Sequence, residues 1–464
     1  MAQSISFTSS PATPSLTSET KIAAFIQNIG TLALLLLALP INASIVFISL
    51  LGNAISRPFQ PSATKAANSK NILISGGKMT KALQLARSFH AAGHRVILLE
   101  THKYWLSGHR FSQAVDKFYT VPAPQENPER YIQALVDIIQ QENIDVYIPV
   151  TSPVGSYYDS LAKPVLSQYC EVFHFDADVT QKLDDKFALA EIARSLNLSV
   201  PKSFKITSAE QVLNFDFSGE SRKYILKSIA YDSVRRLDLT KLPCATFEET
   251  AAFVRSLPIS PDKPWIMQEF IPGKEFCTHS TVRNGELRLH CCCESSAFQV
   301  NYENVENPRI QEWVKHFVKE LKLTGQVSFD FIQAEDGTVY AIECNPRTHS
   351  AITTFYNHPQ VAQAYLDQQP MAETLQPLAT SKPTYWTYHE VWRLTGIRSF
   401  TQLKKWIWNI WRGTDAVYKS DDPLPFLMVH HWQIPLLLLK NLRQLKGWTR
   451  IDFNIGKLVE SGGD

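Results

Sequence analysis

Apolar and polar positions alternate along two neighbouring runs past the middle of the chain. Residues 327–332 alternate small or polar residues with apolar ones, and residues 339–343 repeat the alternation. Asp336-Gly337 lies between the runs and is a dipeptide typical of tight turns. A period of two on both sides of such a turn predicts an antiparallel β-hairpin.

The two predicted strands carry oxygen ligands to one place. Glu343 and Asn345 lie two residues apart, so an extended chain directs both side chains to the same face. Asp330 on the partner strand can reach that face. Two carboxylates and an amide oxygen suit one or two Mg²⁺ ions that bridge ATP phosphates, and Arg347 then offers a planar fork for a phosphate oxygen. A single acidic residue of this kind is more often just a solvated surface group, and only the combination favours a metal site.

Three further elements are predicted upstream of the hairpin. An apolar strand at residues 224–227 ends in Lys227, and a buried strand that ends in lysine needs an anion nearby. Asp184-Asp185-Lys186 opens a helical run that continues to Leu196, where Asn197 is a left-handed cap. Residues 265–276 read as a strand, a bend at Pro272-Gly273 and a second strand.

The order of these parts resembles the ATP-grasp superfamily over about residues 70–370. Six short motifs at the expected spacing carry the resemblance, each of them weak alone: Asp-Lys at 185–186, the strand lysine Lys227, Gln-Glu-Phe-Ile at 268–271, Gly-Lys-Glu at 273–275, Phe-Asp-Phe at 329–331 and Glu-Cys-Asn-Pro-Arg at 343–347. The resemblance implies an α/β (α+β) fold, an ATP-grasp domain preceded by a doubly wound pre-ATP-grasp domain.

The resemblance also implies a role for each matching residue. Lys186 and Lys227 would bind the ATP phosphates, and Glu275 would bind the ribose. The edge of the adenine would contact Gln268, Glu269, Phe270 and Ile271. The ligands of Mg²⁺ or Mn²⁺ would be Asp330, Glu343 and Asn345. Arg347 and Lys227 would be the catalytic cations at the transferred phosphoryl group. The loop after Lys227 lacks the usual glycines, so Ser233, Arg235 and Arg236 are expected to take their place.

The acceptor substrate is expected between this domain and the preceding β-α-β unit of residues 71–100. That unit contains Gly76-Gly77-Lys78, whose spacing does not fit a P-loop. A second strand ends near Thr151 and Ser152, and ligands bind at such carboxyl ends of strands. Both loops are candidate walls of the acceptor site, as is His349, and ordinary connecting loops are an equal alternative.

A narrower resemblance spans nearly the whole chain. The runs at 76–90, 102–111, 343–350 and 447–458, with the apolar N-terminal segment, are similar to the cyanobacterial ATP-grasp ligases of mycosporine biosynthesis. The likeness implies that ATP phosphorylates the enol oxygen of 4-deoxygadusol and that glycine displaces phosphate, giving the ultraviolet-absorbing mycosporine-glycine. The alternatives are an ATP-grasp ligase with a carboxylate acceptor and another amine, or a membrane-tethered, non-catalytic nucleotide-binding protein.

Composition restricts the partners and the compartment. The 464 residues carry a net charge of +2, which argues against nucleic acid as the main partner. Seven cysteines, an odd number, do not form a secreted disulfide framework and fit a reducing compartment. Cys291 to Cys293 are expected in a buried strand, and Cys344 is expected to point into the core.

The N-terminal region predicts an attachment to membranes. No charged residue occurs between Lys21 and Arg57, a stretch long enough to cross a bilayer, although Pro40 and Asn42 interrupt it. A kinked span and a helix lying on one leaflet are both open. More positive charges follow the segment than precede it, which places the catalytic part in the cytoplasm. ATP is found there too, so a cleaved secretory signal is disfavoured.

The expected organisation is therefore a disordered tail (1–20), the apolar segment (21–56), a linker (57–69), the pre-ATP-grasp domain (70–180), the ATP-grasp domain (181–375) and a helical extension (376–464). The extension is rich in leucine and tryptophan. Its helices either pack over the catalytic domains or form a second element at the membrane surface.

Overall fold

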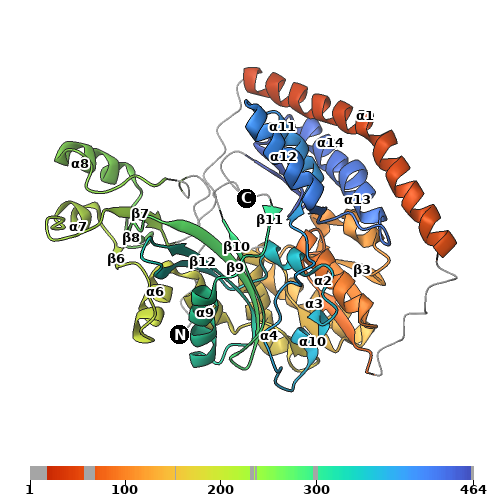
Figure 1. Cartoon of the computed structure of the whole chain (residues 1–464), viewed down its shortest axis with the longest axis horizontal. Helices are drawn as coiled ribbons and strands as arrows, with labels where there is room; N and C mark the ends of the chain where they lie inside the picture. The colour runs from red at the N-terminus through yellow and green to blue at the C-terminus, as the bar shows by residue number, and fades with distance from the viewer. Residues whose placement is uncertain are drawn as a thin grey trace.

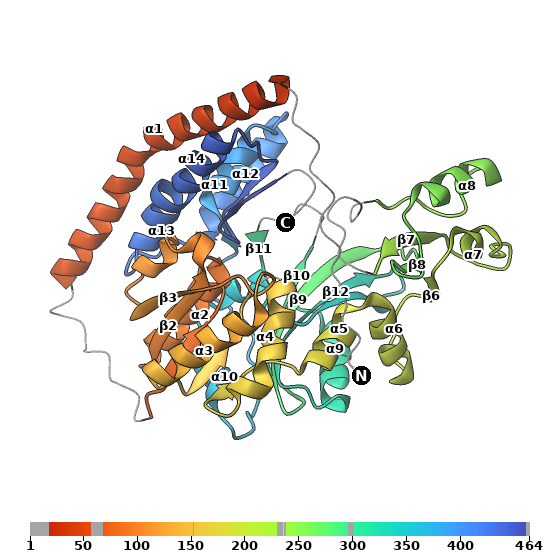
Figure 2. The same ribbon diagram turned by 180° about the vertical axis from the view of Figure 1, so that it is seen from behind.

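The computed structural model describes residues 18–56, 68–151, 153–229, 235, 238–295 and 301–460. The expected tail and linker therefore lie mostly outside the described residues, as do Ser152, Ser233 and Arg236. Figures 1 and 2 show a mixed α/β body with a long helix along one outer edge and a small lobe at the opposite end.

A parallel sheet of order β3-β2-β1-β4-β5 forms the N-terminal unit. Its strands are β1 (Asn71–Ile74), β2 (Arg95–Thr101), β3 (Lys117–Val121), β4 (Val146–Ile148) and β5 (Glu171–Val172). Alternate strand residues pack against α2 (Thr80–Ala91) on one face and against α3 (Pro128–Glu142) and α4 (Pro153–Leu166) on the other. Helices on both faces of a parallel sheet make the doubly wound arrangement that the sequence predicts. Two 3₁₀ turns, η2 (His102–Tyr104) and η3 (Gly108–Phe111), follow β2.

The next part of the chain builds the small lobe. Helices α5 (Ala177–Asp184) and α6 (Lys186–Ser195) lead into it, and Asn197 has the predicted left-handed conformation with φ of 58°. The lobe holds an antiparallel sheet of order β6-β8-β7, made of β6 (Ser203–Ile206), β7 (Tyr224–Ser228) and β8 (Trp265–Glu269). Helices α7 (Ala209–Leu213) and α8 (Phe247–Ser256) cover it and share its hydrophobic core.

The central sheet has the order β10-β9-β12-β13, with β9 (Lys274–Arg283), β10 (Glu286–Glu294), β12 (Gly325–Gln333) and β13 (Val339–Asn345). Strands β12 and β13 are the predicted hairpin, and Gly337 in its turn has φ of +81°. Phe329 and Phe331 pack on α9 (Pro308–Glu320) on one face. On the other face lie η4 (Ser350–Phe355) and α10 (Val361–Leu366). The three adjacent cysteines lie buried in β10 and Cys344 lies in the core, both as predicted.

The C-terminal part contains strands as well as the expected helices. The elements are β11 (Asn301–Tyr302), β14 (Thr384–Tyr385), α11 (Thr387–Leu394), α12 (Phe400–Arg412), β15 (Thr414–Asp415), α13 (Leu424–Met428), the π-helical turn η5 (Val429–Gln433), α14 (Ile434–Gln444), β16 (Arg450–Asp452) and β17 (Lys457–Val459). The order β11-β14-β15 makes a small sheet, and β16 and β17 pair as an antiparallel hairpin, the tail hairpin.

The apolar N-terminal segment is one helix, α1 (Ser18–Ser56). Residues 20–56 of it are long and apolar enough to cross a membrane, and their most apolar 18-residue stretch has a mean hydropathy of 2.4. The helix packs along α13, η5 and α14 (Figure 2). Leu35 and Val46 on its inner side join the main hydrophobic core.

Candidate nucleotide and metal site

The carboxylates of the hairpin meet on the face of the central sheet opposite α9. Asp330 is the register partner of Glu343, and the register shifts between Asp330 and Phe331. Burial, followed by the negative charges of Glu343 and Glu275, raises the pKa of Asp330 to about 8. This concentration of negative charge at Asp330 and Glu343 favours a bound cation.

A lysine already provides part of the missing positive charge. Lys186 Nζ lies 3.1 Å from Glu343 Oε1. Lys186 begins α6, and the Asp185 side chain caps that helix by accepting from the N–H groups of Phe187 at 2.8 Å and Ala188 at 3.0 Å. The Asp-Lys pair therefore has a local explanation: the aspartate fixes the helix start, and the lysine leaves the first turn toward the carboxylates.

Arg347 is held beside the third proposed ligand. Its Nη2 donates to Asn345 Oδ1 at 2.5 Å, and its backbone N–H donates to Asn345 O at 2.7 Å. Its Nη1 lies 3.6 Å from Asp184 Oδ1 at the end of α5. The guanidinium is therefore fixed at the edge of the acidic cluster, where a phosphate oxygen could replace either partner.

The lobe contributes Lys227, whose Nζ donates to the carbonyl oxygen of Asp238 at 2.9 Å. Burial lowers the pKa of Lys227, and the nearby Lys186 adds to this, while Asp238, Glu343 and Glu275 oppose it. The structure thus brings Lys227 within electrostatic range of Lys186 and of the acids of the central sheet. A polyphosphate between the lobe and the sheet would meet both lysines.

The segment proposed for adenine links β8 to β9. The N–H groups of Glu269 and Phe270 donate to the carbonyls of Lys202 and Lys223, each at 2.8 Å, so a base would contact other backbone groups of this linker. Gln268 and Ile271 are buried. Glu275 follows in β9, and its Oε1 accepts from the hydroxyl of Ser295 at 3.3 Å.

The donor set fits a magnesium ion by its chemistry. Two carboxylates and an amide oxygen supply hard oxygen ligands, and mutual repulsion of the acids gives a divalent cation a favourable place. Among the described residues, no group of three or more His, Cys, Asp or Glu side chains is arranged to hold a metal. The proposed set has only two acids, so the remaining ligands would come from nucleotide phosphates and water.

Residues 183–351 match the ATP-grasp domain family. Over this stretch the chain has the fold of an ATP-grasp domain. The match runs from the end of α5 to the start of η4. No curated protein sequence matches the chain.

Solved structures resemble the chain at low sequence identity. The ADP complex of N5-carboxyaminoimidazole ribonucleotide synthetase is 17% identical, with a TM-score of 0.50 over 69% of this chain and 82% of that one. The biotin carboxylase domain of 2-oxoglutarate carboxylase from Hydrogenobacter thermophilus, solved with MgADP and bicarbonate, is 12% identical, with a TM-score of 0.49 over 66% and 72%. L-amino acid ligase from Bacillus licheniformis is 15% identical, with a TM-score of 0.45 over 63% and 70%.

The predicted acceptor loops are tied into the N-terminal unit. Gly76 has φ of +70°, and a Cβ there would lie 2.9 Å from Val150 O, which explains the glycine. The carbonyl of Gly77 accepts from the hydroxyl of Ser107, and Lys78 Nζ lies 3.2 Å from Glu100. Thr151 donates to Asp159 at 2.6 Å. These side chains have protein partners, so a role in substrate binding stays a prediction.

A cluster that contains the predicted His349, together with residues that the sequence did not single out, lies between these loops and the central sheet. We define the acceptor cluster as Lys81, His279, Ser328, Thr348 and His349. Lys81 Nζ donates to Thr348 O at 2.7 Å, and the His349 N–H donates to His279 Nδ1 at 3.2 Å. Within the described part of the chain, the buried atoms His279 Nε2, Ser328 Oγ and Thr348 Oγ1 have no hydrogen-bond partner. Unpaired buried polar atoms are costly, so a bound molecule or water is expected there.

Burial keeps the basic groups of the acceptor cluster largely uncharged. It lowers the pKa of Lys81 to about 7, with the positive charge of Arg347 as the next cause. Burial, with Lys81 and Arg347, likewise lowers the pKa of His349 to about 3. The pKa of His279 is well below its usual value for the same reason. At neutral pH both imidazoles are neutral, and the lowered pKa of Lys81 makes its neutral amine accessible.

The tail hairpin closes this region from the C-terminal side. The carbonyl of Asn454 accepts from the N–H of Thr80 at the start of α2 at 2.8 Å, and its side chain donates to Ser350 Oγ at 2.7 Å. The indole of Trp386 also donates to Thr80 Oγ1, at 3.0 Å. Residues from three distant parts of the chain thus meet beside His349.

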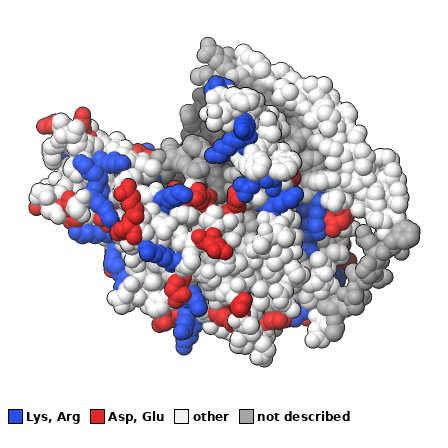
Figure 3. Space-filling view, viewed as in Figure 1, with Lys and Arg blue, Asp and Glu red and all other residues white. Residues whose placement is uncertain are grey.

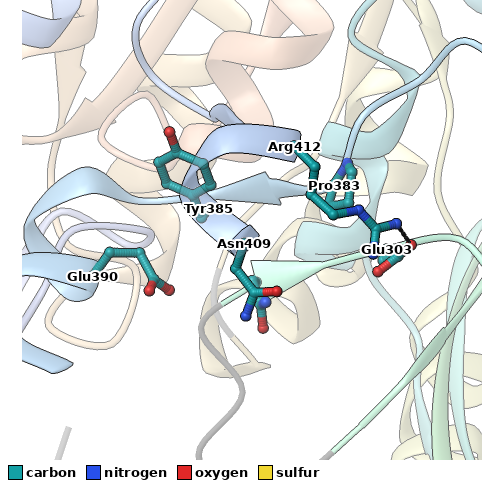
Figure 4. A pocket seen from close by; sticks show the side chains of 7 residues that line it. Glu303, Pro383, Tyr385, Glu390, Asn409 and Arg412 are labelled. Carbon is teal, nitrogen blue, oxygen red and sulfur yellow. Dashed lines mark hydrogen bonds and ion pairs between the residues drawn. The ribbon is translucent and has the colours of Figure 1, made fainter. Parts of the chain in front are cut away.

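A separate small pocket lies between β11, β14, α11 and α12 (Figure 4). Its polar lining includes the ion pair between Arg412 and Glu303. Its volume of about 20 Å³ admits a water molecule but not a substrate. None of the predicted site residues lines it, so we assign it no part in the chemistry.

Proposed function

We propose that the chain is an ATP- and Mg²⁺-dependent ligase that phosphorylates the enol oxygen of 4-deoxygadusol and joins glycine to the activated carbon, giving mycosporine-glycine, ADP and phosphate. The observation that carries the ligase chemistry is the meeting of Lys186, Lys227 and Arg347 around Asp330 and Glu343. The choice of substrates rests on the narrower sequence resemblance.

Two steps account for all the bonds. The γ-phosphoryl group of ATP forms a bond to the enol oxygen while its bond to ADP breaks and the enol proton passes to solvent, which turns a poor leaving group into a good one. The glycine ammonium gives one proton to a base, the free amine forms a bond to the carbon, the carbon–oxygen bond breaks to release phosphate, and the second excess proton on nitrogen passes to the phosphate. Magnesium, when bound, neutralises charge on the transferred group.

The protein's own cations would position the phosphates. Lys186 projects from the first turn of α6 beside Glu343, and Lys227 approaches from the lobe. Arg347 is held by Asn345 at the boundary with the acceptor cluster, where it can follow the phosphoryl group from donor to acceptor. Positioning and electrostatics of this kind supply most of the catalysis in phosphoryl transfer.

The acceptor cluster supplies a base for the amine. We assign this role to Lys81, which is buried within the cluster and donates to Thr348 O beside Arg347. An amine that is partly neutral at physiological pH can accept a proton from the glycine ammonium. The neutral His279 and His349 can donate or accept hydrogen bonds to a polar ring without adding charge.

The test is to incubate the purified chain with ATP, Mg²⁺ and 4-deoxygadusol, with and without glycine. ADP release, the ultraviolet spectrum and the product mass are followed together. Glycine-dependent ADP release with the mass of mycosporine-glycine supports the proposal. ADP release without that product would retain ATP-grasp chemistry and favour a carboxylate acceptor with another amine. No nucleotide turnover with any acceptor would favour a nucleotide-binding scaffold.

We also propose that the catalytic part lies on the cytoplasmic side of a membrane to which α1 attaches it. The apolar length of α1 and the supply of ATP in that compartment support this location.

A further inference from the structure

We propose that the chain is a monotopic membrane protein, with α1 lying in the plane of an anionic phospholipid leaflet and not across it. The lipid-facing surface comprises the outer side of α1 and the exposed apolar residues of α11, α12 and α14. The proposal concerns residues away from the nucleotide site and holds whatever substrate the enzyme uses.

The inner side of α1 is hydrogen-bonded to the body along most of its length. Near its start, Asn28 Nδ2 donates to Lys446 O at 2.9 Å. In its middle, Asn42 Nδ2 donates to the Tyr388 hydroxyl at 2.6 Å. Near its end, Asn53 Nδ2 donates to Ser420 O at 2.7 Å.

These contacts are incompatible with a membrane-spanning helix. Residues 28 and 53 are about 38 Å apart along a helix that rises 1.5 Å per residue. The hydrocarbon core of a bilayer is only about 30 Å thick. If α1 crossed it, the body elements that hold these asparagines would have to enter the hydrocarbon with their charged neighbours.

The outer side of α1 is apolar and uncovered. Exposed large side chains recur along the whole helix, many of them three or four residues apart, and form a broad apolar stripe on the side away from the body. Leu37 is 74% exposed, Ile48 67% and Ile55 64%. The other members are Ile22, Phe25, Ile26, Ile29, Leu34, Leu36, Ile41, Ile45, Phe47, Leu50 and Leu51. Figure 3 shows this flank as an uncharged band. A stripe of this length exceeds what soluble monomers normally expose to water.

The neighbouring helices add aromatic side chains. Trp408 and Trp411 of α12 and Trp392 of α11 are all more than half exposed, and Phe400 at the start of α12 is 80% exposed. Within α12 no residue is buried, although the helix contains three tryptophans. Exposed tryptophans beside an apolar surface are characteristic of the headgroup region of a bilayer.

Cations beside the apolar surface specify an anionic lipid. An open groove on α14 combines Leu436 and Leu439 with Lys440, Arg443 and Gln444. The helix α14 packs directly on α1, so this groove lies on a neighbour of the apolar stripe. Figure 3 shows further Lys and Arg side chains over the C-terminal helices next to α1. Leucines flanked by two cations match an acyl chain with a negatively charged headgroup.

Binding is tested with the full chain and vesicles of phosphatidylcholine, with or without phosphatidylglycerol. We expect flotation with the vesicles, and quenching of tryptophan fluorescence by lipids that carry a shallow nitroxide. The double variant Trp408→Ser, Trp411→Ser should weaken binding at least tenfold and lose most of the quenching. Phe247→Ser, which removes a side chain 62% exposed on the remote α8, is the matched control and should bind like the parent.

The anionic preference is tested with the double variant Lys440→Gln, Arg443→Gln. Each cation near a negatively charged surface is worth roughly a fivefold change in affinity, so its preference for phosphatidylglycerol should fall by about 25-fold. An unchanged preference would refute the role of the α14 groove.

Orientation is tested on the full chain with an N-terminal epitope tag, in membrane vesicles whose cytoplasmic face points outward. An in-plane α1 leaves the tag on the same side as the catalytic part, so added protease removes it. A protected tag would show that α1 crosses the membrane and would overturn the proposal. The proposal would also be overturned if the chain did not bind vesicles and formed a stable oligomer, because a second copy of the chain would then cover the apolar stripe.

Discussion

Replacing Lys81 by methionine should make the protein more stable while it impairs ligation. Lys81 is 6% exposed, and burial lowers its pKa from 10.5 to about 7. The unfolded chain therefore binds more protons than the folded one between these two values, so stability rises with pH across that window. Below pH 7 folding must either bury the charged ammonium of Lys81 or remove its proton, and the free energy of unfolding is lowered by the full cost of doing so.

The size of the effect follows from the shift. A shift of about 3.5 pKa units corresponds to roughly 5 kcal/mol at pH 6, since one unit is worth about 1.4 kcal/mol. At pH 9.5 only about one unit separates the pH from the unfolded value, so about 1.4 kcal/mol remains. Loss of the hydrogen bond to Thr348 offsets the gain by roughly 1 to 2 kcal/mol. We expect a net gain near 3 kcal/mol at pH 6 and almost none at pH 9.5.

The assay compares unfolding midpoints of Lys81→Met and the parent in the same detergent at pH 6 and pH 9.5. Lys205→Met, at an exposed position of β6, is the control and should show a difference that does not depend on pH. A Lys81→Met variant that is less stable than the parent at pH 6, or equally shifted at both pH values, would refute the reasoning. Its glycine-dependent turnover should fall at least 10²-fold, the usual contribution of a general base.

Three other substitutions test the site. Glu343→Gln should lower ADP release by at least 10²-fold at unchanged thermal stability, whereas Glu312→Gln on the exposed side of α9 should have no effect; turnover near the parent rate would contradict the metal role. Lys186→Ala should raise the KM for ATP at least tenfold, measured in steady-state kinetics, and an unchanged KM would remove this lysine from the phosphate site. Asn454→Ala should cost about 1 kcal/mol of stability and raise the KM for the acceptor but not for ATP, because it frees Ser350; equal changes in both constants would indicate general unfolding.

Local sequence patterns predicted the elements that carry the candidate nucleotide site. Alternation around Asp336-Gly337 predicted the hairpin, and its register brings Asp330 opposite Glu343. The position of Lys186 also follows from a local cause, because Asp185 caps the helix that begins there. Roles for these residues still come from the family resemblance and from the geometry of the site, and they await the tests above.

The acceptor cluster could not be predicted in the same way. Lys81 lies on a helix of the N-terminal unit, His279 on a strand of the central sheet and His349 beyond the hairpin, so only tertiary packing brings them together. The sequence contained one signal, since Lys81 follows shortly after the Gly-Gly-Lys loop and directly precedes the apolar residues Ala82 and Leu83. A lysine at a position where α2 is buried on all sides needs a polar partner inside the protein.

The C-terminal region shows a second limit. Its leucines and tryptophans left two interpretations open, and the structure contains features of both: Trp386 is buried next to Thr80, whereas Trp411 is exposed. The number of hydrophobic residues does not distinguish a core helix from a helix at a membrane surface, because apolar residues recur with the same helical period in both. The tail hairpin has too few residues for any pattern to reveal that it reaches Ser350.

The inner side of α1 makes this helix part of the folded body and not an interchangeable anchor. Leu35 and Val46 contribute to the same core as α2 and α14, and Asn42 bonds to Tyr388. Deleting the first 56 residues to obtain a more soluble enzyme would uncover that core and leave several polar groups without partners. A foreign membrane anchor in its place would restore attachment to the membrane but not these contacts. The amino-acid sequence of α1 can therefore change only in ways that keep its packing against the neighbouring helices.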